Sequence, residues 1–300
     1  MFDQQGHSSH ARSLMEKFKV GYIQGHKLWE IDDKMTPEER QMHEKLDRMV
    51  DITKPLVPQV RAMTNKEFMA FVSKPRHVED TDCITFYEDE KLEYYYKWRL
   101  DYANNCKMLI PLVTLYLGLA YYLSKDTSEF AKHFLMFFLG GLAFGWTTSE
   151  YIYHRFYLHR ECELDPEGKA DPDLLETLFV THLHHHVFMN QWIRIGTSVD
   201  LVFYMTIPMQ TILHFILPHT SALLFTAAMV AGGMIEDTIH ISYHKNDANS
   251  WFRFIPNYTR TKDAHMRHHF RDNSKEFGVT TDLFDYMIGT TNLPPKAKQN

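Results

Sequence analysis

Cysteine is scarce in this chain of 300 residues, and its few copies are poorly placed for metal binding. Cys83, Cys106 and Cys162 include no pair at the Cys-x-x-Cys spacing, so neither a cysteine zinc site nor a disulfide framework is indicated. Histidine, by contrast, occurs 19 times. Any metal bound here is therefore expected to be held by imidazole nitrogen, which suits iron, zinc and copper alike.

An excess of positive charge is also missing. The chain has 32 Lys and Arg against 38 Asp and Glu, a net charge of -6, so no nucleic-acid footprint is expected. Residues 1–22 lack the apolar core of a secretory signal peptide. Thr36 followed by Pro37 and two glutamates predicts the start of a helix that runs to about Val50.

The apolar residues are concentrated between about 108 and 240, in stretches over 108–123, 134–153, 199–217 and 221–239. About 16 to 20 helical residues cover roughly 24–30 Å, the thickness of a hydrocarbon core. A soluble helical bundle could contain similar stretches. The short polar links inside each pair favour two membrane hairpins, and thus an all-α integral membrane four-helix bundle. The tyrosines just before residue 100 suit either a membrane interface or a buried aromatic patch.

Ten histidines form four groups along the chain. The groups are His154 with His159; His182 with His185 and His186; His240 with His244; and His265 with His268 and His269. Two groups have i, i+3, i+4 spacing on one helical face, which lets neighbours converge on one metal. His154 and His159 lie about 140° apart on a regular helix, so a bend or an uncoiled turn is expected there. Ten nitrogens exceed what one metal accepts, so two metals are predicted.

Two hairpins return the chain to its starting side, which places all four histidine groups in one compartment. A modest excess of Lys and Arg in the flanking segments assigns that side to the cytosol. His133, His214 and His219 fall near the opposite ends of the spans, whereas His7, His10, His26, His43 and His77 are expected at the surface. His184 lies off the i, i+3, i+4 frame and is expected to be a neighbour of the site. Glu150, Asp237 and Asp263 are candidates to hold the far ring nitrogens of the ligands, or else are solvated or cap helices.

An all-nitrogen site for two metals beside a bilayer suggests iron chemistry with dioxygen on acyl C–H bonds. At these residues the chain resembles the fatty acid hydroxylase superfamily, most of all the sphingolipid N-acyl 2-hydroxylases. Residues 154–159 resemble its HRFxxH motif, 182–186 its HxxHH, 237–244 its DxxHxxxH and 265–270 its HxxHHF. The resemblance extends over about residues 50 to 290. It implies two metals held by the ten histidines, hydroxylation of an acyl chain at C2, and electrons from cytochrome b5.

The chain also departs from that pattern. It has no His-Pro dipeptide of a fused cytochrome b5-like domain, so a donor acting in trans is expected. The segment after His186 lacks the usual proline and aspartate, Leu183 replaces a glycine, and Glu276 stands where the family has glycine. The metal ligands are intact while their surroundings differ, which leaves the substrate open.

These observations divide the chain into a polar N-terminal extension (1–49), a pre-membrane segment (50–107), a four-span hydroxylase domain (108–290) and a tail (291–300). The main hypothesis is a membrane di-iron oxygenase that hydroxylates a free or sphingolipid-linked fatty acid. Oxidation of a sterol or another lipid is the alternative among enzymes. A metal-binding structural subunit of a larger membrane complex, with zinc in place of iron, is the alternative from another class. The resemblance implies the endoplasmic reticulum, with the mitochondrial inner membrane as the alternative.

Overall fold

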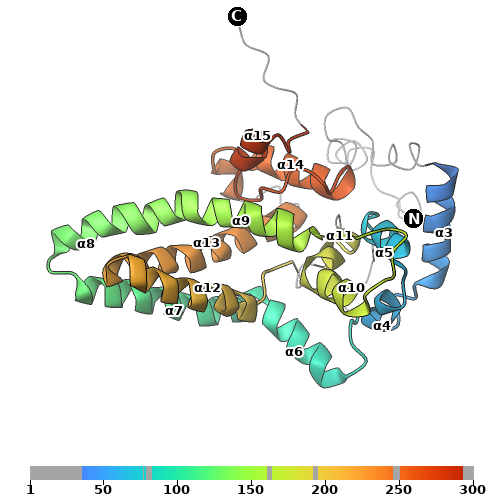
Figure 1. Ribbon diagram of the computed structural model, residues 1–300, viewed down its shortest axis with the longest axis horizontal. Helices are drawn as coiled ribbons and strands as arrows, with labels where there is room; N and C mark the ends of the chain where they lie inside the picture. The colour runs from blue at the N-terminus through green and yellow to red at the C-terminus, as the bar shows by residue number, and fades with distance from the viewer. Residues whose placement is uncertain are drawn as a thin grey trace, which may run out of the picture.

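The computed structural model describes residues 36–76, 78, 83–160, 164–191, 195–245 and 251–292, and every regular element within these ranges is helical. This confirms the predicted all-α class. Long helices run side by side along the longest axis, shorter helices cluster at one end, and α14 and α15 lie above α9 and α11 near the middle of that axis (Figure 1). The long helices and the short ones thus form two regions, and the histidines lie where these regions meet.

Within the part of the chain that the structure describes, three helices are long and apolar enough to cross a membrane: α7 (Tyr102–Leu123), α12 (Val199–Ile216) and α13 (His219–Lys245). Asp101 caps α7, because its carboxylate accepts a 2.8 Å hydrogen bond from the Asn104 backbone. The apolar side chains of α7 and α12 point mostly outward, with Tyr122 82% and Phe215 85% exposed. Such apolar exteriors are stable against lipid and unfavourable in water.

The second predicted span, 134–153, is built differently from the other three. The chain passes through α8 (Thr127–His133), η3 (Phe134–Leu139), η4 (Gly141–Trp146), α9 (Thr147–Tyr153) and η5 (His154–Leu158). These pieces form one continuous helical path, drawn in green in Figure 1, in which the η segments have the wider turns of a π-helix. Three of the four predicted spans thus correspond to long regular helices, whereas the stretch 134–153 is part of a path with π-turns.

Helix α13 lies at the centre of the long helices and contacts α7, α12, η3 and η4. Small residues allow this close packing. A Cβ atom on Gly232 would lie 2.4 Å from the Trp146 side chain, and one on Gly141 would lie 2.8 Å from Cβ of Ala228. The helix continues past the predicted end at 239 to Lys245 and so carries His240 and His244 on its final turns.

The short helices of the other end are α3 (Pro37–Met49), α4 (Leu56–Arg61), α5 (Asn65–Val72), α6 (Glu90–Leu100), α10 (Pro172–Leu178), η7 (Phe179–Leu183) and α11 (His184–Val187). The predicted start of α3 is confirmed, since Thr36 and Glu39 form a reciprocal capping box. Their shared core includes Phe71, Phe86 and Phe179. The tyrosine run is divided: Tyr96 belongs to this core, whereas Tyr94 is exposed.

The C-terminal part comprises η9 (Trp251–Phe254), α14 (Tyr258–Phe270) and α15 (Leu283–Ile288). Helix α15 ends at Gly289, whose φ of +82° is the left-handed conformation that favours glycine. Buried Tyr243 on α13 and Val279 in the segment after α14 share a small core, and the Tyr243 hydroxyl donates to the Val279 carbonyl over 3.1 Å. This contact fixes the C-terminal part against the end of α13.

Candidate metal centre

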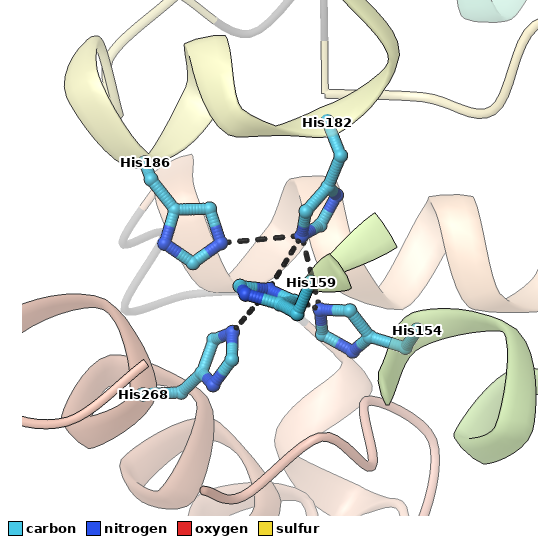
Figure 2. Close-up of side chains that lie close together, drawn as sticks. All are labelled: His154, His159, His182, His186 and His268. Atoms are coloured by element: carbon cyan, nitrogen blue, oxygen red, sulfur yellow. Dashed lines mark hydrogen bonds between the residues drawn. The ribbon is translucent and has the colours of Figure 1, made fainter. Parts of the chain in front are cut away.

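The ten predicted histidines meet in two groups of five. The first group contains His154, His159, His182, His186 and His268, and the second contains His185, His240, His244, His265 and His269. Within each group, one ring nitrogen from every histidine lies within 4.8 Å of the others. Figure 2 shows the first group, whose rings point toward one another from separate parts of the chain. Each group could hold one metal ion.

The groups do not follow the clusters of the sequence, which corrects the prediction that close neighbours converge on one metal. In the cluster at 182–186, His182 and His186 belong to the first group and His185 belongs to the second. In the cluster at 265–269, His265 and His269 belong to the second group and His268 belongs to the first. Positions i+3 and i+4 differ by about 100° around a helix, so their rings diverge. Both helical segments therefore lie between the two groups and contribute to each.

His154 and His159 reach one group through a π-turn. The His159 backbone N–H donates to the His154 carbonyl over 3.0 Å, an i to i+5 bond, and the two Nε2 atoms are 3.1 Å apart. The wider turn brings residues five apart onto one face. The predicted departure from a regular helix is therefore present, and it takes the form of a π-turn that ends at His159, whose φ of -102° and ψ of 28° are not helical.

Backbone carbonyls set the protonation of several rings. The Nδ1 atoms of His154, His268 and His185 donate to the carbonyls of Phe277, Lys275 and His182, at 2.5, 2.6 and 2.5 Å. A neutral imidazole that donates from Nδ1 carries a lone pair on Nε2. In the first group, Nε2 atoms approach each other to 3.0–3.2 Å. The Nε2 lone pairs of His154 and His268 point into this cluster, where a cation bound among the five Nε2 atoms would satisfy them.

The spacing fits a metal ion. At metal–nitrogen distances of about 2.1 Å, ligands at right angles lie about 3.0 Å apart. The imidazoles are also in the form that binds metal, because burial lowers the pKa of His182, His186 and His268 well below the ordinary value of 6.5. These rings are therefore neutral at pH 7, as ligands must be.

The second group has the same character. His265 Nε2 lies 3.0 Å from Nε2 of His244 and 2.9 Å from that of His269. The buried Nε2 atoms of His185 and His240 have no hydrogen-bond partner among the described residues. Buried nitrogen without a partner is costly, and a metal ion would satisfy it. The rings of His186 and His269 lie 4.1 Å apart between centroids and join the two groups.

The three predicted carboxylates, Glu150, Asp237 and Asp263, do not accept hydrogen bonds from the rings of the ligand histidines. Glu150 accepts from the backbone of Val279 over 2.6 Å and of Thr280 over 3.0 Å, and Asp237 accepts from the backbone of Thr197 over 2.8 Å. Asp263 is exposed. These contacts correct the expected ring partners, because the acids hold backbone segments beside the site.

Glu236, which the sequence prediction missed, is the carboxylate near a ligand ring. Its Oε1 lies 3.7 Å from Nδ1 of His240. The signal was present in the sequence, since Glu236 precedes His240 by four residues and hence by about one helical turn.

The remaining histidines fall outside both groups. His184 is buried, and its Nδ1 donates to the Phe179 carbonyl over 2.9 Å, as expected of a neighbour. His133 pairs with Ser221, and His214 with His219, near the α12–α13 connection. His43 is buried, so its predicted surface position is wrong. His7, His10, His26 and His77 lie outside the described residues.

A cavity of about 280 Å³ connects the long helices with the histidines. Its walls are mostly apolar and include Leu109, Val202, Met205, Met229 and Val230. His154, His182 and His240 border the same cavity, so it reaches ligands of both groups. An apolar chain lying between the membrane helices could therefore extend to the candidate metals.

Fold and site together define a class: an all-helical protein with membrane-type helices and, at their ends, two all-histidine groups that could each hold a metal ion. A model of the family described as fatty acid hydroxylase matches residues 138–290, which contain all ten histidines. The chain belongs to the fatty acid hydroxylase family. The prediction of an oxidoreductase of this family is confirmed.

Known relatives agree with this membership. The chain is 25% identical over 253 residues to the ceramide very long chain fatty acid hydroxylase scs7 of Schizosaccharomyces pombe, covering 81% of this chain and 66% of that protein. It is 24% identical to the dihydroceramide fatty acyl 2-hydroxylase FAH2 of Arabidopsis thaliana, covering 80% and 92%. The solved structure of full-length scs7p, with only the hydroxylase domain visible, superposes with a TM-score of 0.70 at 22% identity, over 88% of this chain and 96% of that one. That likeness shows the fold.

Proposed function

We propose that this chain hydroxylates a membrane fatty acyl chain at C2, in a free or sphingolipid-linked fatty acid. The observation that carries the proposal is an apolar cavity that ends at histidines of both five-nitrogen groups. The names of the two relatives, a ceramide fatty acid hydroxylase and a dihydroceramide 2-hydroxylase, support an acyl substrate.

The roles of the chain's own residues follow from their places. The ten histidines of the two groups hold two metals, for which iron is expected and zinc can substitute. When bound, the metals supply the activation of dioxygen for insertion into a C–H bond. The apolar walls around Val202, Met205 and Val230 exclude water and align the acyl chain with the histidines. Glu236 orients the His240 ring.

The membrane arrangement is part of the same proposal. The path Thr127–Leu158 serves as a fourth crossing beside the three long helices, so that two hairpins leave both histidine groups on the cytosolic side. The divisions at 49, 107 and 290 separate an extension, a pre-membrane segment, the hydroxylase domain and a tail. Electrons come from a separate cytochrome b5-type donor. The membrane is that of the endoplasmic reticulum, with the mitochondrial inner membrane as the alternative.

The test combines metal analysis with lipid analysis. The purified chain should hold two metals, and deleting its gene should deplete 2-hydroxylated acyl chains. His268→Ala should abolish the product while the protein remains abundant. An unchanged lipid profile, with the chain co-purifying stoichiometrically with a large complex, would instead establish the structural-subunit alternative. A changed sterol profile would instead support the alternative that the enzyme oxidises a sterol or another lipid.

A further inference from the structure

The segment that follows α14 supplies carbonyls to the first histidine group. The Lys275 carbonyl accepts from His268 Nδ1, and the Phe277 carbonyl accepts from His154 Nδ1. The Phe277 ring also lies against His154, His159 and His268, with centroids 5.5–5.7 Å away. The position of this short segment therefore decides where two of the five rings point.

Glu276 stands between those two carbonyls, in an unusual conformation. Its φ is +59°, in the left-handed region that residues with a Cβ seldom adopt. Its backbone N–H donates to the Thr290 carbonyl over 2.8 Å. Surrounding contacts must hold such a residue in place, and strained residues of this kind concentrate at functional sites.

The contact that holds Glu276 is a buried ion pair with Arg267. Arg267 Nη2 lies 2.6 Å from one carboxylate oxygen, and Nε lies 3.0 Å from both. The side chains are only 6% and 2% exposed. Asn292 donates to the same carboxylate from its backbone and its side chain, over 3.3 and 3.1 Å. Arg267 directly precedes His268, so the pair connects the helix that carries a ligand to the segment that orients it.

We infer that Glu276 is a positioning residue of the first metal centre. Through the ion pair and the left-handed backbone, it aims the Lys275 and Phe277 carbonyls at His268 and His154. Those carbonyls keep the Nδ1 protons in place and the Nε2 lone pairs directed at the metal. The inference rests on the proposed binding of metal by these histidines.

The effect should be confined to one centre. Both rings that donate to the Lys275 and Phe277 carbonyls belong to the first group. In the second group, His185 donates to the His182 carbonyl, and Glu236 lies beside His240. A residue that only stabilised the fold would affect both centres together.

The test measures zinc release from the full-length chain, loaded with Zn²⁺ in detergent and mixed with excess chelator. Wild-type protein should release two ions in two kinetic phases, one for each centre. The phase that is missing in His268→Ala belongs to the first centre. Glu276→Gln keeps the shape and should speed that phase about 10- to 100-fold while the other phase is unchanged. Asp282→Asn is the matched control, because Asp282 also pairs with an arginine of α14, Arg260, over 2.6 Å. It should leave both phases unaltered.

A double variant separates positioning from the effect of an unpaired charge. Arg267→Met with Glu276→Gly removes both charges and suits the left-handed backbone, yet it breaks the link to α14. If Glu276 is a positioning residue, zinc release from the first centre of this double variant should remain faster than in the wild-type protein. Wild-type release from the double variant, or equal acceleration of both phases in Glu276→Gln, would overturn the inference. A wild-type chain without zinc would overturn the metal assignment as well, whereas zinc binding without lipid product would count against the proposed reaction alone.

Discussion

At the scale of single residues, the far ring nitrogens decide which lone pairs meet. His154 and His268 give their Nδ1 protons to carbonyls of the segment after α14, and His185 gives its proton to the carbonyl of His182. The contacts of His154 and His268 turn their Nε2 atoms toward the first group, and the contact of His185 turns its Nε2 toward the second group. His184 also donates from Nδ1 to a carbonyl, that of Phe179, yet it belongs to neither group and packs against the Phe179 ring.

His184 and His186 test this distinction as neighbours on the same short helix. His186→Ala removes a nitrogen of the first group and should lower bound metal from two ions to one, with at least about a 100-fold loss of hydroxylation. His184→Ala should keep both metals and cost about 2 kcal/mol of unfolding free energy, because it opens the aromatic core around Phe179. Metal analysis and thermal unfolding distinguish the two. Equal metal loss in both variants would contradict the assignment.

Protonation provides a second test at the same scale. The folded-state pKa of His182, His186 and His268 is lowered by burial, so between that value and 6.5 the unfolded chain binds more protons. The stability of the metal-free chain is thus fully present above pH 6.5 and is lost as the pH falls below it. Each histidine contributes up to about 1.4 kcal/mol per pH unit. Unfolding of the metal-free protein at pH 7.5 and 5.5 measures this loss, and His268→Ala should reduce it. A constant midpoint would argue against buried neutral imidazoles.

At the scale of elements, helix winding and small residues place the site. The π-turn of η5 puts His154 and His159 in one group. The glycines of α13 allow the π-turn path Thr127–Leu158 to pack closely against α13. Gly232 faces Trp146, which also borders the cavity. The packing of α13 therefore shapes the cavity as well as the bundle.

Gly232 and Gly118 form a matched pair for this packing. A Cβ on Gly232 would lie 2.4 Å from Trp146, whereas a Cβ on Gly118 in α7 would meet nothing within 4 Å. Gly232→Ala should therefore lower the unfolding free energy by about 1–3 kcal/mol through overpacking. Gly118→Ala should raise it by up to about 1 kcal/mol, because alanine favours the helix. Thermal unfolding in detergent compares them, and similar shifts in both would exclude close packing at Gly232.

The same elements show what could be predicted from the sequence. The all-α class and the metal-binding residue types follow from apolar runs and from histidine spacing, both of which are local. The assignment of His185 and His268 to opposite groups depends on how two helices are rotated in the fold, which spacing does not encode. The π-turns and the left-handed Glu276 depend likewise on hydrogen bonds to distant segments. Glu236 could have been found, since it lies one turn before His240 on the same helix.

At the scale of the whole molecule, the cavity relates the membrane helices to the histidines. Exposed apolar residues cover the outside of α12, while Thr206 of the same helix faces the cavity. The helix thus separates lipid from the path toward the site. The residues that line the path of the substrate differ from those that would bind metal. A substitution can therefore alter substrate access without altering metal binding.

Thr206 and Ile207 provide the test of that separation. Thr206 is buried at the cavity wall, whereas Ile207, about 100° further around the helix, is 58% exposed on the outside. Thr206→Trp should fill the cavity and reduce 2-hydroxylated product at least about 10-fold, because the acyl chain can no longer lie beside the histidines. Both metals should remain, since no ligand is touched. Ile207→Trp, which places the same side chain toward lipid, should keep both product and metal. Lipid analysis of cells expressing each variant, with metal analysis of the purified proteins, measures the outcome. Full activity in Thr206→Trp would show that the substrate reaches the histidines by another route.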